Sequence, residues 1–145
     1  MTSASTRQGL PDPFKPPYAR LVAIDLNKGE ILWSVANGDG LRNHPAFKGL
    51  SLPAMGTPGR DAPLITKSLV FMGEGSDTSV GVPAGFGGPM FRAFDKKTGK
   101  ILWEMALPAG VSNAPMTYMV NGKQYIVVAV SGRNFPGEYV ALALP

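Results

Sequence analysis

Apolar and polar residues follow the same order in two segments of the chain. Residues 21–35 read LVAIDLNKGEILWSV, and residues 91–105 read FRAFDKKTGKILWEM. In both segments, alternating small or apolar residues lead to an aspartate, a glycine follows, and an Ile-Leu-Trp strand leaves. An aspartate can hydrogen-bond the backbone of a tight turn, and glycine accepts the positive φ that such a turn needs. The pattern therefore predicts the same β-hairpin twice.

Other stretches of the chain also alternate or run apolar over strand lengths. The run YIVVAV is apolar on both sides, which is typical of a strand covered on both faces. It is joined to the preceding strand at Asn121-Gly122, which suits a type I′ turn. The further strands are expected at 63–66, 69–73, 115–120, 124–130 and 139–144. We therefore predict an all-β chain with almost no helix. A repeated unit of this kind indicates a solenoid or a propeller.

The composition of the chain is consistent with an all-β domain and excludes several other classes of protein. The chain has 145 residues, of which 44% are hydrophobic and 17% charged, with 18 glycines and 14 prolines, as in a turn-rich all-β domain. The net charge of +4 is spread singly over turns, so no nucleic-acid-binding stripe is expected. The absence of cysteine excludes a disulfide framework and covalent haem. Residues 1–20 carry four prolines and no apolar core, so we expect neither a signal peptide nor a membrane span.

The two hairpins carry a resemblance to a known family. The alanine, glycine and tryptophan of AIDLNKGEILW and AFDKKTGKILW are spaced as in the tryptophan-docking motif of quinoprotein dehydrogenases. The likeness continues through LPAGVSNAPMTYMVNGKQYIVVAVSGR and EYVALALP, and it covers residues 18–145. The chain is similar to the end of pyrroloquinoline quinone (PQQ) dependent dehydrogenases, nearest the glucose dehydrogenase-like group. In those proteins a histidine is expected where this chain has Ser131-Gly132-Arg133, and this departure argues against glucose as the substrate.

The resemblance implies a partial β-propeller, the last two to three blades of an eight-bladed ring built from four-stranded antiparallel blades. The chain then divides into an irregular lead-in (1–17), an outer half-blade (18–35), a long loop (36–60), a complete blade with an inserted loop at 74–89 (61–106), and a last blade lacking its outer strand (107–145). The two long loops are expected to open on the same face of the propeller. Insertions that gather on one face of a repeat protein usually form its binding face.

Four polar residues are candidates for contact with the cofactor. The resemblance places Arg60 and Arg133 within reach of the propeller axis, where an anionic polycarboxylate such as PQQ would accept bidentate donors from arginine. Ser112 and Asn113 open the connection into the last blade. The alternative is that all four are solvated loop residues. No catalytic residue and no metal ligand can be assigned.

Several other residues are interpreted structurally. Trp33 and Trp103 are expected to pack between adjacent blades, and the repeated aspartates are expected to serve the turns. His44, the single histidine, is interpreted as a loop residue. Glu74 and Asp77 lack the ligand density of a calcium loop. The glycine-rich segment around them is not a dinucleotide fingerprint, and neither Gly-Lys pair belongs to a phosphate loop.

The resemblance implies that the parent protein oxidises sugar or alcohol hydroxyls with PQQ and a calcium or magnesium ion, and passes electrons to a quinone or a cytochrome. The chain alone is expected to be inactive and to supply part of the cavity wall. Its partners would be the missing blades, or further copies of itself. A periplasmic parent is implied, although this chain carries no signal peptide. Two alternatives stay open: a non-catalytic propeller that serves as a binding scaffold, and the product of a truncated gene.

Overall fold

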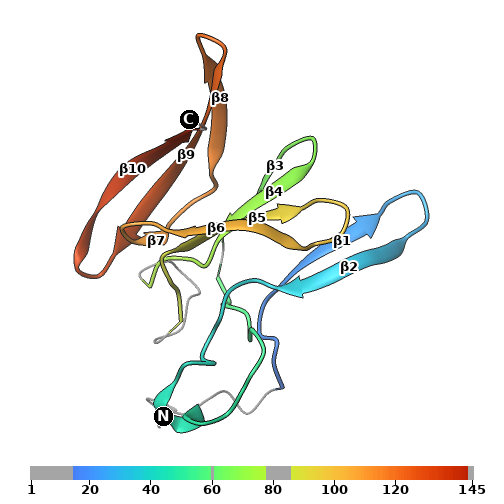
Figure 1. Cartoon of the computed structure of the whole chain (residues 1–145), viewed down its shortest axis with the longest axis vertical. Helices are drawn as coiled ribbons and strands as arrows, with labels where there is room; N and C mark the ends of the chain where they lie inside the picture. The colour runs from blue at the N-terminus through green and yellow to red at the C-terminus, as the bar shows by residue number, and fades with distance from the viewer. Residues whose placement is uncertain (1–14, 60, 78–85, 144–145) are drawn as a thin grey trace, which may run out of the picture.

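The computed structural model describes residues 15–59, 61–77 and 86–143, and these form three antiparallel sheets (Figure 1). The first sheet pairs β1 (Arg20–Asp25) with β2 (Glu30–Ala36). The second contains β3 (Leu64–Ile65), β4 (Leu69–Gly73), β5 (Met90–Asp95) and β6 (Ile101–Ala106), in that order. The third contains β7 (Gly110–Val111), β8 (Met116–Val120), β9 (Lys123–Gly132) and β10 (Phe135–Ala143). Apart from one 3-10 turn, η1 (Pro45–Phe47), the described residues contain no helix. The all-β prediction is confirmed.

Both copies of the repeated segment fold as the predicted hairpin. Gly29 and Gly99 each have a φ of 70°. The Asp25 Oδ1 atom accepts hydrogen bonds from two backbone N–H groups of its turn, at 2.9 and 3.3 Å. The equivalent atom of Asp95 accepts two backbone N–H groups at 3.1 and 2.8 Å. The same local chemistry therefore forms the same turn in two different sheets.

Trp33 joins the first sheet to the second. Its indole Nε1 donates to the backbone oxygen of Lys96 at 3.0 Å, in the turn between β5 and β6. Its six-membered ring lies so close to Gly99 that a Cβ atom on this glycine would be 2.6 Å from Trp33 Cε3. The interpretation of Trp33 as a packing residue between sheets is confirmed. Trp103 has the same register in its own hairpin, but it is 43% exposed and contacts Phe91 edge to face at 6.4 Å, so its predicted role stays a prediction.

The main hydrophobic core lies between the second and third sheets. Partly buried apolar residues of both sheets surround a fully buried cluster, which consists of Phe91, Leu107, Ala109, Val111, Val128 and Val130. β4 approaches this cluster at Gly73, where any Cβ atom would collide with the Val111 side chain. Glycine at this position therefore allows the two sheets to pack closely.

The third sheet differs in detail from the sequence-based expectation. β9 continues to Gly132 and β10 begins at Phe135, so the hairpin extends beyond the strands predicted at 124–130 and 139–144. A register shift between Phe135 and Glu138 accommodates the proline and glycine there, and Phe135 packs against the core. β7 was not predicted either, because a two-residue strand has no detectable period. It pairs with β9 beyond the end of β8.

Candidate functional site

The longest connections lie on one side of the sheets. The described parts of the two longest connections, residues 37–59 and residues 74–77 with 86–89, extend below the sheets in Figure 1, whereas the short turns β1–β2, β3–β4 and β8–β9 point the other way. Hydrogen bonds join the two long segments: Asn37 Nδ2 donates to Gly73 O at 2.8 Å, and Asp39 N donates to Glu74 Oε1 at 3.3 Å. For the described parts of both loops, the expectation that they gather on one face is confirmed. We call this side the loop face.

Residues 74–77, which we call the clasp, leave β4 at the centre of the loop face. The clasp begins with Glu74, which is only 5% exposed and forms a buried ion pair with Arg92 of β5. Arg92 also donates through Nε to the half-exposed Glu104 at 2.9 Å. Since Glu74 additionally accepts the Asp39 amide, this one carboxylate connects the second sheet to the loop that follows the first sheet.

The other end of the clasp contacts the third sheet. Ser76 is fully buried, and its hydroxyl donates to Ser131 O at 2.7 Å. Asp77 Oδ1 accepts the backbone N–H of Arg133 at 3.1 Å. The clasp backbone also passes so close to Gly110 that a Cβ atom there would lie 2.5 Å from Gly75 O. These four residues thus connect the second sheet to the third sheet and to the loop that follows the first sheet.

Three of the four predicted cofactor residues lie within the described part of the chain; Arg60 lies outside it. Arg133 is exposed in the β9–β10 turn, where its amide binds the clasp. Ser112 is half-buried, and its amide donates to Ala129 O at 3.0 Å. Asn113 is exposed, and its Oδ1 accepts the next amide at 2.8 Å, which leaves its NH₂ group to donate.

These three residues are not gathered at one point. Ser112 sits opposite Ala129, and Arg133 follows four residues later along the β9 side of the hairpin. At about 3.3 Å per strand residue, that separation is about 13 Å. Ser112 and Asn113 therefore lie apart from the β9–β10 turn that carries Arg133, and a ligand that touched all three would have to be elongated.

Sequence reasoning missed the buried polar residues of the loop face. Asn37 is 3% exposed, and within the described residues its Oδ1 has no hydrogen-bond partner. Arg92 lies in β5, and the residues on either side of it in this strand are buried. An arginine within an apolar strand is the sequence signal that could have indicated a buried ion pair. Glu74, considered at first for a cation, binds this arginine instead. In the described ranges no cluster of histidine, aspartate and glutamate is arranged to hold a metal.

One further carboxylate near the loop face has a raised pKa. Asp61 lies just before β3, and burial raises its pKa above the ordinary 3.8, partly opposed by a hydrogen bond from its own backbone.

None of the helical segments that the structure describes is long and apolar enough to cross a bilayer.

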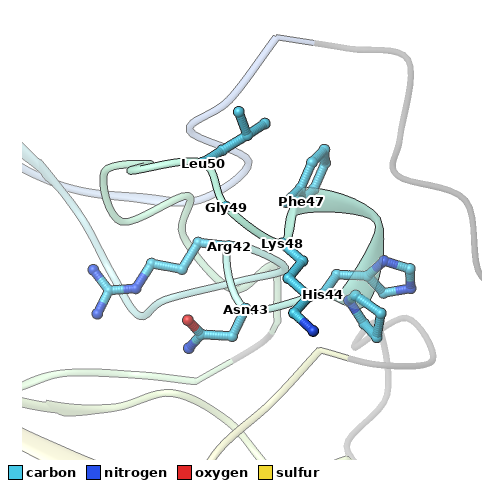
Figure 2. A pocket seen from close by; sticks show the side chains of 8 residues that line it. Arg42, Asn43, His44, Phe47, Lys48, Gly49 and Leu50 are labelled. Carbon is cyan, nitrogen blue, oxygen red and sulfur yellow. The ribbon is translucent and has the colours of Figure 1, made fainter.

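The segment between β2 and β3 also forms a projecting arm, residues 40–54. Its stem is closed by backbone hydrogen bonds from Met55, Gly56 and Thr57 to residues 37–39, at 2.6 to 3.1 Å. Near its tip lies an open depression of about 490 Å³, lined mainly by Arg42, Asn43, His44, Phe47, Lys48 and Leu50 (Figure 2).

The observed architecture defines a class of protein: antiparallel sheets in chain order, joined by a tryptophan and an apolar core, with the longest connections on one face, form a partial β-propeller. The chain belongs to the PQQ-dependent dehydrogenases, since the family model described as "Glucose/ethanol/alcohol dehydrogenase, beta-propeller domain" matches residues 2–126. The family resemblance found in the sequence is confirmed.

Individual relatives agree with this family. The glycerol dehydrogenase large subunit of Gluconobacter thailandicus is 33% identical over 139 residues, and the quinoprotein glucose dehydrogenase of Gluconobacter oxydans is 35% identical over 140 residues. Each match covers 90% of this chain but only 17% and 16% of the relative. The quinohemoprotein alcohol dehydrogenase of Comamonas testosteroni superimposes with a TM-score of 0.56 at 25% identity, over 86% of this chain and 16% of that structure.

Proposed function

We propose that the chain is part of a longer PQQ-dependent dehydrogenase that oxidises sugar or alcohol hydroxyls, and that the loop face forms part of the wall of its cofactor and substrate cavity. The observation that supports this role is the clasp, which connects the second sheet to the third sheet and to the loop after the first, and which binds the backbone of the predicted donor Arg133. A cavity wall has to hold such donors in place, and buried hydrogen bonds do so. Because the chain spans about a sixth of its relatives, we expect it to be inactive alone.

The three described donors suit PQQ chemically. Arg133 offers a guanidinium to a carboxylate, Asn113 an NH₂ group, and Ser112 a hydroxyl, so all three can donate to an oxygen-rich anion. Arg60 would add a second guanidinium. When bound, PQQ supplies the quinone that takes up the electrons removed from the substrate. This chain's residues would bind and orient the cofactor, and we assign none of them to the chemical step.

The remaining parts of the proposal concern the parent protein. We propose that it holds calcium or magnesium beside PQQ and that it acts in the periplasm. A quinone or cytochrome acceptor is supported by the names of two relatives, a probable quinate dehydrogenase (quinone) from Xanthomonas campestris and the methanol dehydrogenase [cytochrome c] subunit 1 of Paracoccus denitrificans. We also propose that Trp33 and Trp103 act as docking tryptophans between blades, as the Trp33 contact supports.

The proposal is tested by exchanging the corresponding segment of the Gluconobacter oxydans glucose dehydrogenase for this chain. We expect the chimera to bind PQQ with calcium and to reduce a dye with a sugar or an alcohol. Arg133→Gln should raise the PQQ dissociation constant about 10- to 100-fold, the value of a charge-assisted hydrogen bond. Arg20→Gln, an equal charge change on exposed β1, should leave it unchanged.

Two results would contradict the proposal. Turnover by the isolated chain, titrated with PQQ and calcium, would show that copies assemble a whole site. A folded chimera that binds no PQQ would favour the binding scaffold instead. Light scattering on the isolated chain would report any self-association through its open sheet edges.

A further inference from the structure

The arm carries a set of side chains that can donate hydrogen bonds to a ligand. Arg42 and Lys48 are cations, Asn43 has an amide NH₂ group, and no acidic residue occurs between residues 40 and 59. His44 Nδ1 accepts the Ala46 amide at 3.2 Å, so the neutral ring carries its proton on Nε2 and donates there. All of these residues line the same depression, whose volume of about 490 Å³ is sufficient for a small molecule.

The arm holds these residues in a defined arrangement. Backbone hydrogen bonds of 2.8 to 3.1 Å run from Phe47 to His44 O, from Lys48 to Pro45 O and from Leu50 to Phe47 O. The rings of His44 and Phe47 also meet edge to face, with centroids 6.3 Å apart. Because the backbone of the tip is bonded to itself, a ligand would meet a formed site and would not have to order a loose loop.

Charge is unevenly distributed over this tip. Arg42 is partly neutralised by Asp39, at 3.1 Å, whereas within the described residues the Lys48 ammonium has no hydrogen-bond or ion-pair partner. Figure 2 shows Asn43 and Lys48 on one side of the arm backbone and Phe47 and Leu50 on the other. One side of the tip is therefore positive and rich in donors, and the other is apolar.

We propose that the arm pocket binds a small oxyanion, a carboxylate or phosphate group, held by Lys48 and Arg42 with His44 and Asn43 as neutral donors. Carboxylates and phosphates are the ligands that guanidinium and ammonium donors recognise. The site is separate from the loop-face donors, and its occupancy does not depend on PQQ or on oxidation of a substrate. The inference therefore goes beyond the proposed function and is tested independently of it.

The single histidine makes the experiment specific. We would follow the ring signals of His44 by NMR at pH 8 while adding sodium phosphate, sodium gluconate or glycerol to the full chain, with sodium chloride at matched ionic strength. Phosphate, gluconate or both should shift the ring signals to saturation, with a dissociation constant of about 1 mM. Glycerol and chloride should not. Saturation by phosphate alone would assign a phosphate ligand, and saturation by gluconate alone would assign a carboxylate ligand.

Two variants with equal charge changes complete the test. Lys48→Gln should weaken binding about five- to tenfold, the loss expected for one charge close to the ligand. Lys67→Gln, in the exposed β3–β4 turn on the opposite side, should leave binding unchanged. An unchanged Trp33 indole signal will show that both variants are folded. Non-saturating shifts equal to those of chloride, or equal affinities in wild type and Lys48→Gln, would overturn the proposal.

Discussion

The contact between Trp33 and Gly99 can be tested within the chain's own repeat. Gly99→Ala places a methyl group 2.6 Å from Trp33 Cε3 and 2.8 Å from Cδ2. Gly29→Ala makes the same change at the equivalent turn, where φ is also 70° and nothing lies within 4 Å of the added atom. The two substitutions therefore share their backbone cost and differ only in the contact with the indole.

The expected difference follows from two contributions, because the backbone cost is the same for both variants. Alanine at a left-handed φ costs about 1 to 2 kcal/mol of folding free energy at either turn. At Gly99 the clash adds about 1 to 3 kcal/mol. Displacement of Trp33 also breaks its bond to Lys96 O, which contributes about 1 kcal/mol. Gly99→Ala should thus be less stable than Gly29→Ala by about 2 to 4 kcal/mol.

Urea unfolding, followed by tryptophan fluorescence, measures the free energy of unfolding of both variants. The NMR signal of the Trp33 indole N–H reports whether its hydrogen bond is kept. Trp33→Phe replaces the indole by a smaller phenyl ring and removes the N–H donor. In this background the destabilisation caused by Gly99→Ala should approach that caused by Gly29→Ala. If the two glycine variants differed by less than about 0.5 kcal/mol, within the usual scatter of such measurements, the contact would not be what joins the first two sheets.

The loop face and the turns give two further predictions. Glu74→Ala should destabilise the chain by about 3 kcal/mol, because it leaves the buried Arg92 with only its half-exposed partner, Glu104. Glu104→Ala should destabilise it by less than about 1 kcal/mol. Equal losses of stability in urea unfolding would contradict this prediction. Hydrogen bonds from Thr98 hold the pKa of Asp95 below 3.8, so the stability that they contribute is present above that pH and is lost as the pH falls through the lower, folded pKa. The loss of stability caused by Thr98→Val should therefore be larger at pH 6 than near pH 3, and a pH-independent loss would refute the linkage.

The repeated hairpins and the family could be predicted because their signals are local. Asp25 and Asp95 hydrogen-bond amides two and three residues away, and the glycines satisfy a backbone requirement of their own turn. Such contacts are encoded within about five consecutive residues, so they are visible in the sequence whatever surrounds them. The packing role of Trp33 followed from its place in that repeat.

The candidate site was predicted only in part. The sequence indicated that two long loops share a face, and it singled out Ser112, Asn113 and Arg133 as polar residues near that face. It did not indicate that Asp77 binds the Arg133 amide, 56 positions away, or that about 13 Å of strand separates Ser112 from Arg133. Contacts at such separations depend on how whole sheets pack, and no short pattern records them.

The sequence by itself determined the strand-rich class, the two equivalent turns, the sheet-joining tryptophan and the membership of a quinoprotein family, because each depends on neighbouring residues or on a repeated motif. Only the tertiary structure decided that Glu74 pairs with Arg92 in the interior and that the clasp connects the second sheet to the third sheet and to the loop after the first. It also decided that Arg42, His44 and Lys48 line one pocket. A buried charge needs a partner, and which residue supplies that partner is settled by the packing of distant segments.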